Sequence, residues 1–232
     1  MITVRRSEDR GHESNGWLES RHTFSFGEYE DTSFMGFRTL RVINEDRVAP
    51  GEGFGMHPHR DMEIFSYVLE GELEHKDSLG NGKVLRPGDV QLLSAGTGIS
   101  HSECNPSYSA ASHFLQVWIQ PAKRFLPPEY QDWYPTPEVL NANKVLILSC
   151  DGRDNSATIH QHADVWRLKM GDGEKVTHEL QPGRGVWLQV VRGEVELNGT
   201  ELRAGDGASV EVFGTITVRA RVDAEALLFD LV

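Results

Sequence analysis

The sequence predicts an all-β protein made of two tandem jelly-roll barrels in one chain. Short apolar or alternating runs, such as residues 64–69 and 90–93, are separated by turns rich in glycine and proline. This pattern is typical of short antiparallel strands that close into a barrel. A weak internal repeat adds the second barrel, because a pattern in the first half of the chain returns in the second half.

The repeat consists of two pairs of matching segments. Residues 67–74 (YVLEGELE) match residues 189–196 (QVVRGEVE), and residues 86–89 (RPGD) match residues 203–206 (RAGD). Self-similarity of this kind indicates a duplicated domain. The two halves should therefore share one topology.

Length and charge limit the domain count and the partners. The chain has 232 residues, and we expect one domain at residues 1–122 and a second at residues 123–232, each of an ordinary domain size. A chain of this length can bury a sizeable core without stabilisation by disulfide bonds or metal ions. The formal net charge is −12, which disfavours nucleic acid and an anionic membrane surface as partners. We expect a monomer that binds a small molecule.

The cysteines and the N-terminus suggest a compartment. Cys104 and Cys150 are the only cysteines, which is too few for a disulfide framework and favours a reducing environment. Residues 1–9 lack the apolar core of a signal peptide. No run of about 18 apolar residues exists to span a membrane. The expected location is the cytoplasm.

Residues 1–50 lead into the first barrel. Residues 2–4 and 40–44 are expected to form strands. His12 is interpreted as an ordinary surface histidine, whereas His22 is left open between that role and a lining of the site. The glycines of residues 48–55 should turn the chain into the next strand. A phosphate-binding loop is a poor explanation, because no helical pattern follows them.

Two short motifs carry the candidate metal ligands. His57-Pro58-His59 and His101-Ser102-Glu103 each place two donor groups at positions i and i+2. On a β-strand such residues point to the same face. Imidazoles combined with a carboxylate suit Fe, Ni, Cu, Zn or Mn. Buried without a metal, these groups would be left unpaired at about 1–3 kcal/mol each, which disfavours a purely structural role.

The segment between the two motifs should form the wall of the barrel. Phe65, Tyr67 and Leu69 share the strand parity that we assign to the inner face, and they would give an apolar wall suited to an aromatic substrate. Residues 72–75 alternate like a half-buried strand, and residues 113–119 read as a further strand.

The second half should lack a metal site. Residues 124–137, rich in proline and aromatic residues, are expected to be a packed linker, and residues 145–149 to begin the second barrel. No histidine follows His178, so His101 has no counterpart. His160-Gln161-His162 forms another H-x-H pair. Because no second pair follows it, we interpret these as surface or interface histidines.

Longer patterns resemble known families. Two of them, each with one altered gap, resemble the cupin motifs: Gly51-x5-His57-x-His59-x3-Glu63-x7-Gly71 and Gly96-x4-His101-x3-Asn105. More narrowly, the whole chain resembles the pirin family and is similar to bacterial pirin-like proteins described as quercetin 2,3-dioxygenases. The blocks that carry this resemblance are residues 22–26 (HTFSF), 35–37 (MGF), 41–44 (RVIN), 57–59 (HPH), 61–63 (DME) and 94–103 (SAGTGISHSE).

The resemblance implies a ligand set with two competing carboxylates. Cupins in general take the carboxylate ligand from the position of Glu63, whereas pirins take it from the position of Glu103. The pirin resemblance implies the ligands His57, His59, His101 and Glu103, with Glu63 as a neighbouring pocket group. Either carboxylate could accept a proton from the substrate. One divalent transition metal is expected, iron first, with Mn, Ni, Cu, Co and Zn as alternatives.

The resemblance also implies an activity. A flavonol such as quercetin would bind through its deprotonated 3-hydroxyl and be cleaved by O2 with loss of carbon monoxide, which makes the protein a metal-dependent dioxygenase. Eukaryotic pirins are associated with transcription factors, so a non-enzymatic redox-sensing regulator acting through protein contacts is the alternative. A cupin isomerase or a metal-binding stress protein is a third hypothesis.

Overall fold

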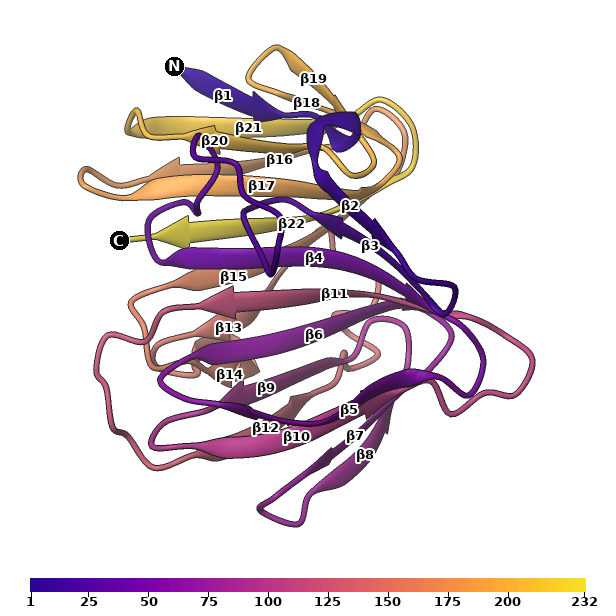
Figure 1. Ribbon diagram of the computed structural model, residues 1–232. Helices are drawn as coiled ribbons and strands as arrows, with labels where there is room; N and C mark the ends of the chain where they lie inside the picture. The colour runs from indigo at the N-terminus through magenta and orange to yellow at the C-terminus, as the bar shows by residue number, and fades with distance from the viewer. The chain divides into compact units, whose positions relative to one another are not determined.

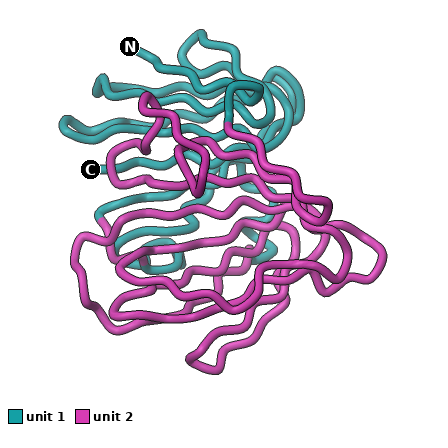
Figure 2. The backbone as a smooth tube through the Cα atoms, in the orientation of Figure 1, with its two compact units in different colours: residues 1–10, 136–158, 162–232 teal, residues 11–135, 159–161 magenta.

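The computed structural model describes residues 1–232 and consists almost entirely of β-strands (Figure 1). Two short 3-10 helices, η1 (Ser7–Asp9) and η2 (Arg153–Asn155), interrupt them. Neither is long and apolar enough to cross a membrane. The chain divides into two compact units, shown in teal and magenta in Figure 2. The predicted all-β fold with two barrel domains is confirmed.

Unit 2 comprises Gly11–Pro135 and Ile159–Gln161. Its seven-stranded sheet has the order β12-β9-β6-β11-β4-β3-β2, and its four-stranded sheet has the order β5-β10-β7-β8. The strands are β2 (Gly11–Ser14), β3 (Leu18–His22), β4 (Leu40–Val48), β5 (Gly53–His59), β6 (Glu63–Glu70), β7 (Leu73–Asp77), β8 (Gly82–Leu85), β9 (Val90–Ser94), β10 (Ile99–Cys104), β11 (Ser112–Ile119) and β12 (Glu129–Trp133).

Unit 1 comprises Met1–Arg10, Thr136–Thr158 and His162–Val232. Its sheets have the orders β1-β20-β17-β22-β15-β13-β14 and β16-β21-β18-β19. The strands are β1 (Ile2–Arg5), β13 (Lys144–Ser149), β14 (Ala157–Thr158), β15 (Asp164–Met170), β16 (Lys175–Leu180), β17 (Gly185–Arg192), β18 (Glu194–Leu197), β19 (Thr200–Arg203), β20 (Gly207–Val210), β21 (Gly214–Ala220) and β22 (Ala224–Leu231).

The two units repeat one strand order. The series β9-β6-β11-β4 of unit 2 corresponds to β20-β17-β22-β15 of unit 1, and β5-β10-β7-β8 corresponds to β16-β21-β18-β19. The repeat seen in the sequence falls on β6 and β7 in unit 2 and on β17 and β18 in unit 1. The duplication is therefore present at the level of strand pairing.

The compact units do not follow the expected boundary between residues 122 and 123. β12 lies beyond that boundary but pairs with β9, with Gln131 opposite Leu92. β1 lies at the N-terminus but pairs with β20, with Val4 opposite Ala208. Each seven-stranded sheet thus takes an edge strand from outside its expected half, because backbone pairing and not chain order defines the unit.

The inner face of the large sheet of unit 2 carries two apolar clusters. At one end Val68 packs with Phe114, Leu73 and Leu85, and at the other Ile64 packs with Leu93 and Ile99. Burying each such side chain contributes about 1.5–3 kcal/mol to folding. On β6 these clusters use alternate residues, with buried Ser66 between them.

The alternation along β6 contradicts the expectation that Phe65, Tyr67 and Leu69 line the inner face. Because Ile64, Ser66 and Val68 face inward, the intervening Phe65, Tyr67 and Leu69 point to the opposite face of β6 and do not form the inner wall.

The close approach of β5 and β10 requires a glycine at position 53. An added Cβ at Gly53 would lie 2.4 Å from the Glu103 carbonyl oxygen and 2.5 Å from Cys104 Cα. We therefore expect Gly53→Ala to force the strands apart and to lower the free energy of unfolding by about 1–3 kcal/mol, the usual cost of overpacking. Chemical denaturation measures this loss.

A matched control lies on the same strand. A Cβ added at Gly55 meets no atom within 4 Å, so Gly55→Ala should change the free energy of unfolding by no more than about 1 kcal/mol. Equal effects of the two substitutions would show that the contact with β10 does not limit residue 53.

Candidate metal centre

The two ligand motifs lie on neighbouring antiparallel strands. In the pairing of β5 with β10, His57 is directly opposite His101, and His59 is opposite Ile99. Beyond His101 the register shifts, so that Glu103 is opposite Phe54. A shift of this kind bends a strand and re-aims side chains, and it is common beside active sites.

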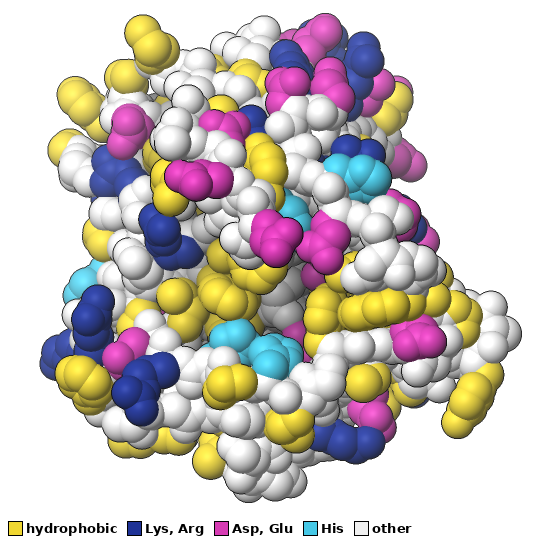
Figure 3. Space-filling model, viewed as in Figure 1, with side chains coloured by type: hydrophobic (Ala, Val, Ile, Leu, Met, Phe, Trp, Pro, Cys, Tyr) yellow, Lys and Arg dark blue, Asp and Glu magenta, His cyan; other side chains and the backbone are white.

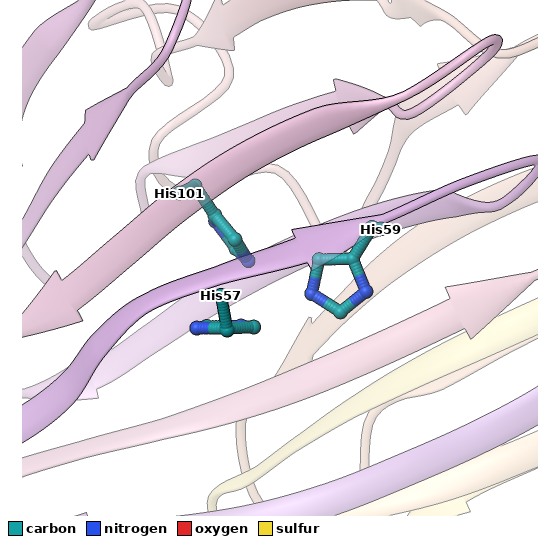
Figure 4. A group of neighbouring side chains, drawn as sticks. All are labelled: His57, His59 and His101. Atoms are coloured by element: carbon teal, nitrogen blue, oxygen red, sulfur yellow. The ribbon is translucent and has the colours of Figure 1, made fainter.

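Three imidazoles converge in front of these strands (Figure 4). The ring centroids of His57 and His59 are 4.8 Å apart, those of His57 and His101 4.5 Å, and those of His59 and His101 4.9 Å. Each ring offers one nitrogen, and these nitrogens all lie within 4.8 Å of one another. One ion could therefore contact all three.

The environment keeps two of these imidazoles neutral. Burial, together with the neighbouring imidazoles of His101 and His57, lowers the pKa of His59 to about 4. Burial, with His57 and His75 nearby, lowers the pKa of His101 to about 3. Only a neutral imidazole has a free lone pair for a metal, so both rings remain competent donors well below neutral pH.

A backbone contact orients His57. Its Nδ1 lies 2.7 Å from the carbonyl oxygen of Gly55, and because a carbonyl can only accept, Nδ1 carries the proton. The lone pair of His57 is therefore on Nε2. Hydrogen bonds of this type fix the tautomer of metal-binding histidines.

A chain of hydrogen bonds orients His101. Nε2 of the buried His75 donates to Asp77 Oδ2 at 3.1 Å, and its Nδ1 accepts from Gln91 Nε2 at 2.9 Å. His101 Nδ1 lies 3.4 Å from the same His75 nitrogen. The one lone pair on His75 Nδ1 is then shared by the Gln91 amide and, at the longer distance, the Nδ1 proton of His101, so the lone pair of His101 is on Nε2.

Asp77 anchors this chain as an ionised carboxylate. Although burial alone would raise the pKa of Asp77, hydrogen bonds from Asn81, His75 and the backbone lower it below the usual value. Its Oδ1 accepts from the N–H groups of Leu79 and Asn81 at 2.9 and 3.0 Å. An ionised carboxylate is an acceptor only, so it requires the proton of His75 on Nε2.

Glu103 is buried beside the imidazoles. Its Oε1 accepts from Ser66 Oγ at 2.6 Å, and its Oε2 accepts from Gln116 Nε2. One oxygen of Glu103 lies within 4.8 Å of nitrogens of His75 and His101. Its two donors hold the carboxylate beside the imidazole cluster, as the H-x-E motif predicts for a same-face pair.

These contacts belong to a polar row that crosses the large sheet. Consecutive members are directly opposite one another on adjacent strands: His22 and Asn44, Asn44 and Gln116, Gln116 and Ser66, Ser66 and Gln91. All five side chains are buried. Gln116 and Ser66 hold Glu103, and Gln91 holds His75. The row therefore supplies the hydrogen bonds that position the centre.

A cavity of about 310 Å³ opens in front of the centre. Roughly 300–1,000 Å³ is usual for a small-molecule site. Figure 3 shows histidine side chains at one side of a hollow and acidic side chains across from them. The lining residues are Glu13, Leu18, Ser20, His22, Phe26, Asn44, Asp46, Phe54, His57, His59, Glu103, Gln116 and Trp118.

Aromatic rings form the side wall of this cavity. The ring centroid of Trp118 is 4.9 Å from that of His59 and 5.4 Å from that of Phe26, and both pairs are in edge-to-face contact. The ring centroids of Phe26 and His22 are 5.3 Å apart. Phe54 packs edge-to-face on Trp17 at 5.2 Å. Flat apolar walls of this kind favour an aromatic ligand.

Glu63 is placed elsewhere. It does not line the cavity, and its Oε2 accepts hydrogen bonds from Ser94 Oγ at 2.8 Å and from the backbone N–H of His160 at 3.2 Å. The expectation that Glu63 shares the face of the histidines fails because Asp61 has a φ of 48°. This left-handed residue ends the parity of β5, and Glu63 begins a strand in the other sheet.

The remaining histidine candidates separate clearly. His22 lines the cavity, whereas His12 is an exposed residue 2.7 Å from Glu19 Oε2, as expected for a surface histidine. His160 Nε2 lies 3.4 Å from Glu129 Oε2, and His162 is exposed. Neither His160 nor His162 belongs to a group of ligating side chains.

Sequence reasoning missed the residues that position the ligands. His75, Asp77, Gln91 and Gln116 were not among the candidates. The available signal is a polar residue at the centre of an apolar strand, as in residues 90–93 (VQLL) and 114–118 (FLQVW). Such a residue is tolerated only when it is hydrogen-bonded.

The centre fits a metal ion. His101 Nε2 is buried and has no hydrogen-bond partner. Because the proton of this ring is on Nδ1, Nε2 carries an unpaired lone pair. An unpaired buried acceptor costs about 1–3 kcal/mol, and a cation between the imidazoles would remove that cost. Three imidazole nitrogens with a carboxylate beside them suit a divalent transition metal.

The fold and this site define a two-domain cupin protein with a histidine centre in one domain. A sequence model of the pirin family matches residues 3–119, and a model described as the quercetinase C-terminal cupin domain matches residues 146–231. The chain belongs to the pirin family.

Relatives resemble the chain over its whole length. It is 45% identical to the quercetin 2,3-dioxygenase of Escherichia coli strain K12 over 233 residues, which cover 100% of this chain and 99% of that protein. It is 38% identical to a pirin-like protein of Caulobacter vibrioides over 232 residues, with 99% of both chains covered.

Solved structures resemble the fold closely. A crystal structure of YhhW from Escherichia coli has a TM-score of 0.97 at 45% identity and covers 100% of this chain and 98% of that one. A structure of the bacterial pirin YhhW in complex with nickel(II) has a TM-score of 0.95 at 45% identity, with 100% and 99% covered. The resemblance to pirins stated from the sequence is confirmed.

The orienting chain predicts a loss of metal affinity on His75→Phe. Phenylalanine keeps the stacking of residue 75 on Tyr130, whose ring centroid is 4.9 Å away, but it removes the acceptor for the Nδ1 proton of His101. We expect metal affinity to fall about 10–100-fold, as is usual when such a partner is lost. Competition with a chelator measures this affinity.

Two controls accompany this variant. Tyr130→Phe removes a hydroxyl that bonds to Asp132 at 2.5 Å and leaves the stacked ring in place. His162→Ala changes an exposed histidine outside the ligating groups. Both should retain wild-type affinity. Unchanged affinity in folded His75→Phe would contradict the orienting role of His75.

Proposed function

We propose that His57, His59, His101 and Glu103 bind one divalent transition metal. The converging imidazoles and the unpaired buried nitrogen of His101 support this ligand set. The nickel complex of YhhW, 45% identical to this chain, supports a transition metal. The same donors also suit Fe, Mn, Cu, Co and Zn. Iron, which is expected from the sequence, and nickel are therefore both candidates for the bound metal.

We propose that the protein is a metal-dependent dioxygenase that cleaves a flavonol such as quercetin with O2. One observation carries this proposal: His57, His59 and Glu103 line the same cavity as the rings of Trp118 and Phe26. A flat molecule with an oxygen donor at one edge fits such a site. The names of the relatives, quercetin 2,3-dioxygenase among them, support the same activity.

The residues of the chain have separate roles in this proposal. A bound metal would lower the pKa of the flavonol 3-hydroxyl and hold its oxygen. Trp118, Phe26 and Phe54 hold the ring system and exclude water. Glu103, which Ser66 and Gln116 position, accepts the hydroxyl proton at a carboxylate oxygen. Glu63 has no direct part, because it does not line the cavity.

Unit 1 lacks this ligand set. Strand β16 corresponds to β5, and its only histidine is His178. Strand β21 corresponds to β10 and has no histidine. His178 Nε2 is 2.7 Å from Asp230 Oδ2, and the ring belongs to no group of ligating side chains. The second unit therefore serves as a scaffold in this proposal.

The proposal predicts one metal per chain and a metal-dependent reaction. After reconstitution with Fe, Mn, Ni, Cu or Co, elemental analysis should give one ion per chain. At least one of these forms should consume quercetin and O2 and release carbon monoxide, and chelation should abolish the reaction. Two tightly bound ions would contradict the site assignment. Reversible metal oxidation without quercetin consumption would instead favour the redox-sensing regulator.

The two buried glutamates should respond differently to the same substitution. Glu103→Gln removes an anionic donor from the cluster, and we expect the metal content and quercetin consumption to fall at least tenfold, the lower range for groups that support a metal. Glu63→Gln should retain both. The two variants are compared side by side, after circular dichroism shows that both are folded. A loaded Glu103→Gln variant beside an empty Glu63→Gln variant would reverse the assignment.

A further inference from the structure

A second polar group lies in the cavity, on β3 and β4, away from the strands that carry the histidine ligands. It consists of Ser20, His22, Asn44 and Asp46, all of which line the cavity. Their exposed fractions are only 2%, 3%, 4% and 4%. None of them is a proposed metal ligand or proton acceptor, so their place in the cavity lining calls for a separate explanation.

The two β4 residues of this group, Asn44 and Asp46, each have one side-chain atom without a hydrogen-bond partner. Asp46 Oδ1 accepts from Ser20 Oγ at 2.5 Å, and Asn44 Oδ1 accepts from His22 Nδ1 at 2.8 Å. These contacts leave Asp46 Oδ2 and Asn44 Nδ2 unpaired within the chain. Both side chains are more than nine-tenths buried and line the cavity, so the two atoms are available to a group that occupies it.

The two unpaired atoms are complementary in type. Asp46 Oδ2 is an acceptor, and Asn44 Nδ2 is a donor. Because the residues are at positions i and i+2 of β4, both side chains point to the same face. A hydroxyl group donates one hydrogen bond and accepts others, so it can satisfy both atoms. A cation could not accept from the amide.

The charge of this region excludes an anionic ligand group. Burial, only partly offset by the hydrogen bond from Ser20, raises the pKa of Asp46 to about 7, and Glu103, Glu45 and Glu13 act in the same direction. A carboxylate or phosphate would add negative charge beside these groups. A neutral hydroxyl adds none, and it supplies a hydrogen bond to the poorly solvated carboxyl.

We infer that Asp46 and Asn44 form a subsite for a hydroxyl group on the part of the substrate that does not reach the metal. This inference rests on the proposed flavonol activity and narrows its substrate class. The substrate is a flat aromatic molecule with a metal-binding oxygen at one edge and a further hydroxyl elsewhere on its rings. Trp118 and Phe26 form the apolar wall beside the rings.

The test measures binding to metal-loaded protein under nitrogen, where ring cleavage cannot proceed. The three probes are quercetin, galangin, which lacks the hydroxyls on the pendant ring, and 3-hydroxyflavone, which keeps only the metal-binding hydroxyl. We expect wild-type protein to bind quercetin at least tenfold more tightly than 3-hydroxyflavone. The affinity for galangin shows which ring carries the recognised hydroxyl.

The variants separate the subsite from general packing. Asp46→Leu keeps a similar shape but removes both oxygens, and it should weaken quercetin binding about 10–100-fold, because the ligand hydroxyl loses its partner in a buried site. Its affinity for 3-hydroxyflavone should not change. Asp46→Asn keeps one acceptor oxygen, so its affinity for quercetin should fall less than that of Asp46→Leu. It replaces the leucine variant in this test if that variant does not fold.

Glu45→Gln is the matched control. Glu45 is the neighbouring carboxylate on β4, but it faces away from the cavity and contacts His113 Nε2 at 3.0 Å. The Glu45→Gln variant should bind all three probes with wild-type affinity. An equal loss for every probe in Asp46→Leu, or no loss for any, would overturn the subsite.

The same data distinguish the two proposals. Wild-type protein that discriminates between quercetin and 3-hydroxyflavone, yet consumes neither in air, would retain the hydroxyl subsite and reject the dioxygenase. Protein that cleaves both with equal affinity would retain the dioxygenase and reject the subsite. Failure to bind any probe would reject both.

Discussion

Polar groups on the inner face of unit 2 must be hydrogen-bonded, because the face is otherwise apolar. The polar row from His22 to Gln91 meets most of this constraint by placing its members opposite one another on successive strands, although Gln91 Oε1 and Asn44 Nδ2 have no partner within the chain. Two apolar clusters flank the row and fix the strands that carry it. The row in turn fixes Glu103 and His75. Positioning of the metal centre therefore depends on the register of the whole sheet, and a one-residue slip would send every member of the row to the other face.

The histidine centre is asymmetric in how it is supported. His57 is oriented by a carbonyl of its own strand, whereas His101 is oriented through His75 by a carboxylate on β7. A backbone carbonyl is neutral, whereas Asp77 is ionised, so in the proposed site this hydrogen-bond chain would make His101 the more electron-rich donor. The chain thus has a means of tuning one ligand without changing the others. Substitutions in the loop that holds Asp77 would act on the metal from a distance.

Local patterns in the sequence predict the strands, the duplication and the paired motifs, since alternation and spacing record which residues share a face. The inner face of β6 was predicted wrongly because the residues from Glu63 to Leu69 are all buried and carry no alternation. Only Ser66 marks the side that faces the site. The position of Glu63 depends on a left-handed residue, Asp61, which the pattern does not reveal. The pairings of β1 and of His75 join distant segments, and local sequence does not record them.

The N-terminal strand has a consequence for how the chain is made. β1 pairs with β20, so Ile2 must wait for Val210 before its hydrogen bonds can form. During synthesis, most of unit 2 can close while the sheet of unit 1 still lacks its later strands. Contacts so distant in sequence are slow to form. The folding of unit 1, not of the unit that carries the histidine centre, is therefore the late step. Deletion of β1 or a bulky insertion beside it would therefore disturb unit 1 first.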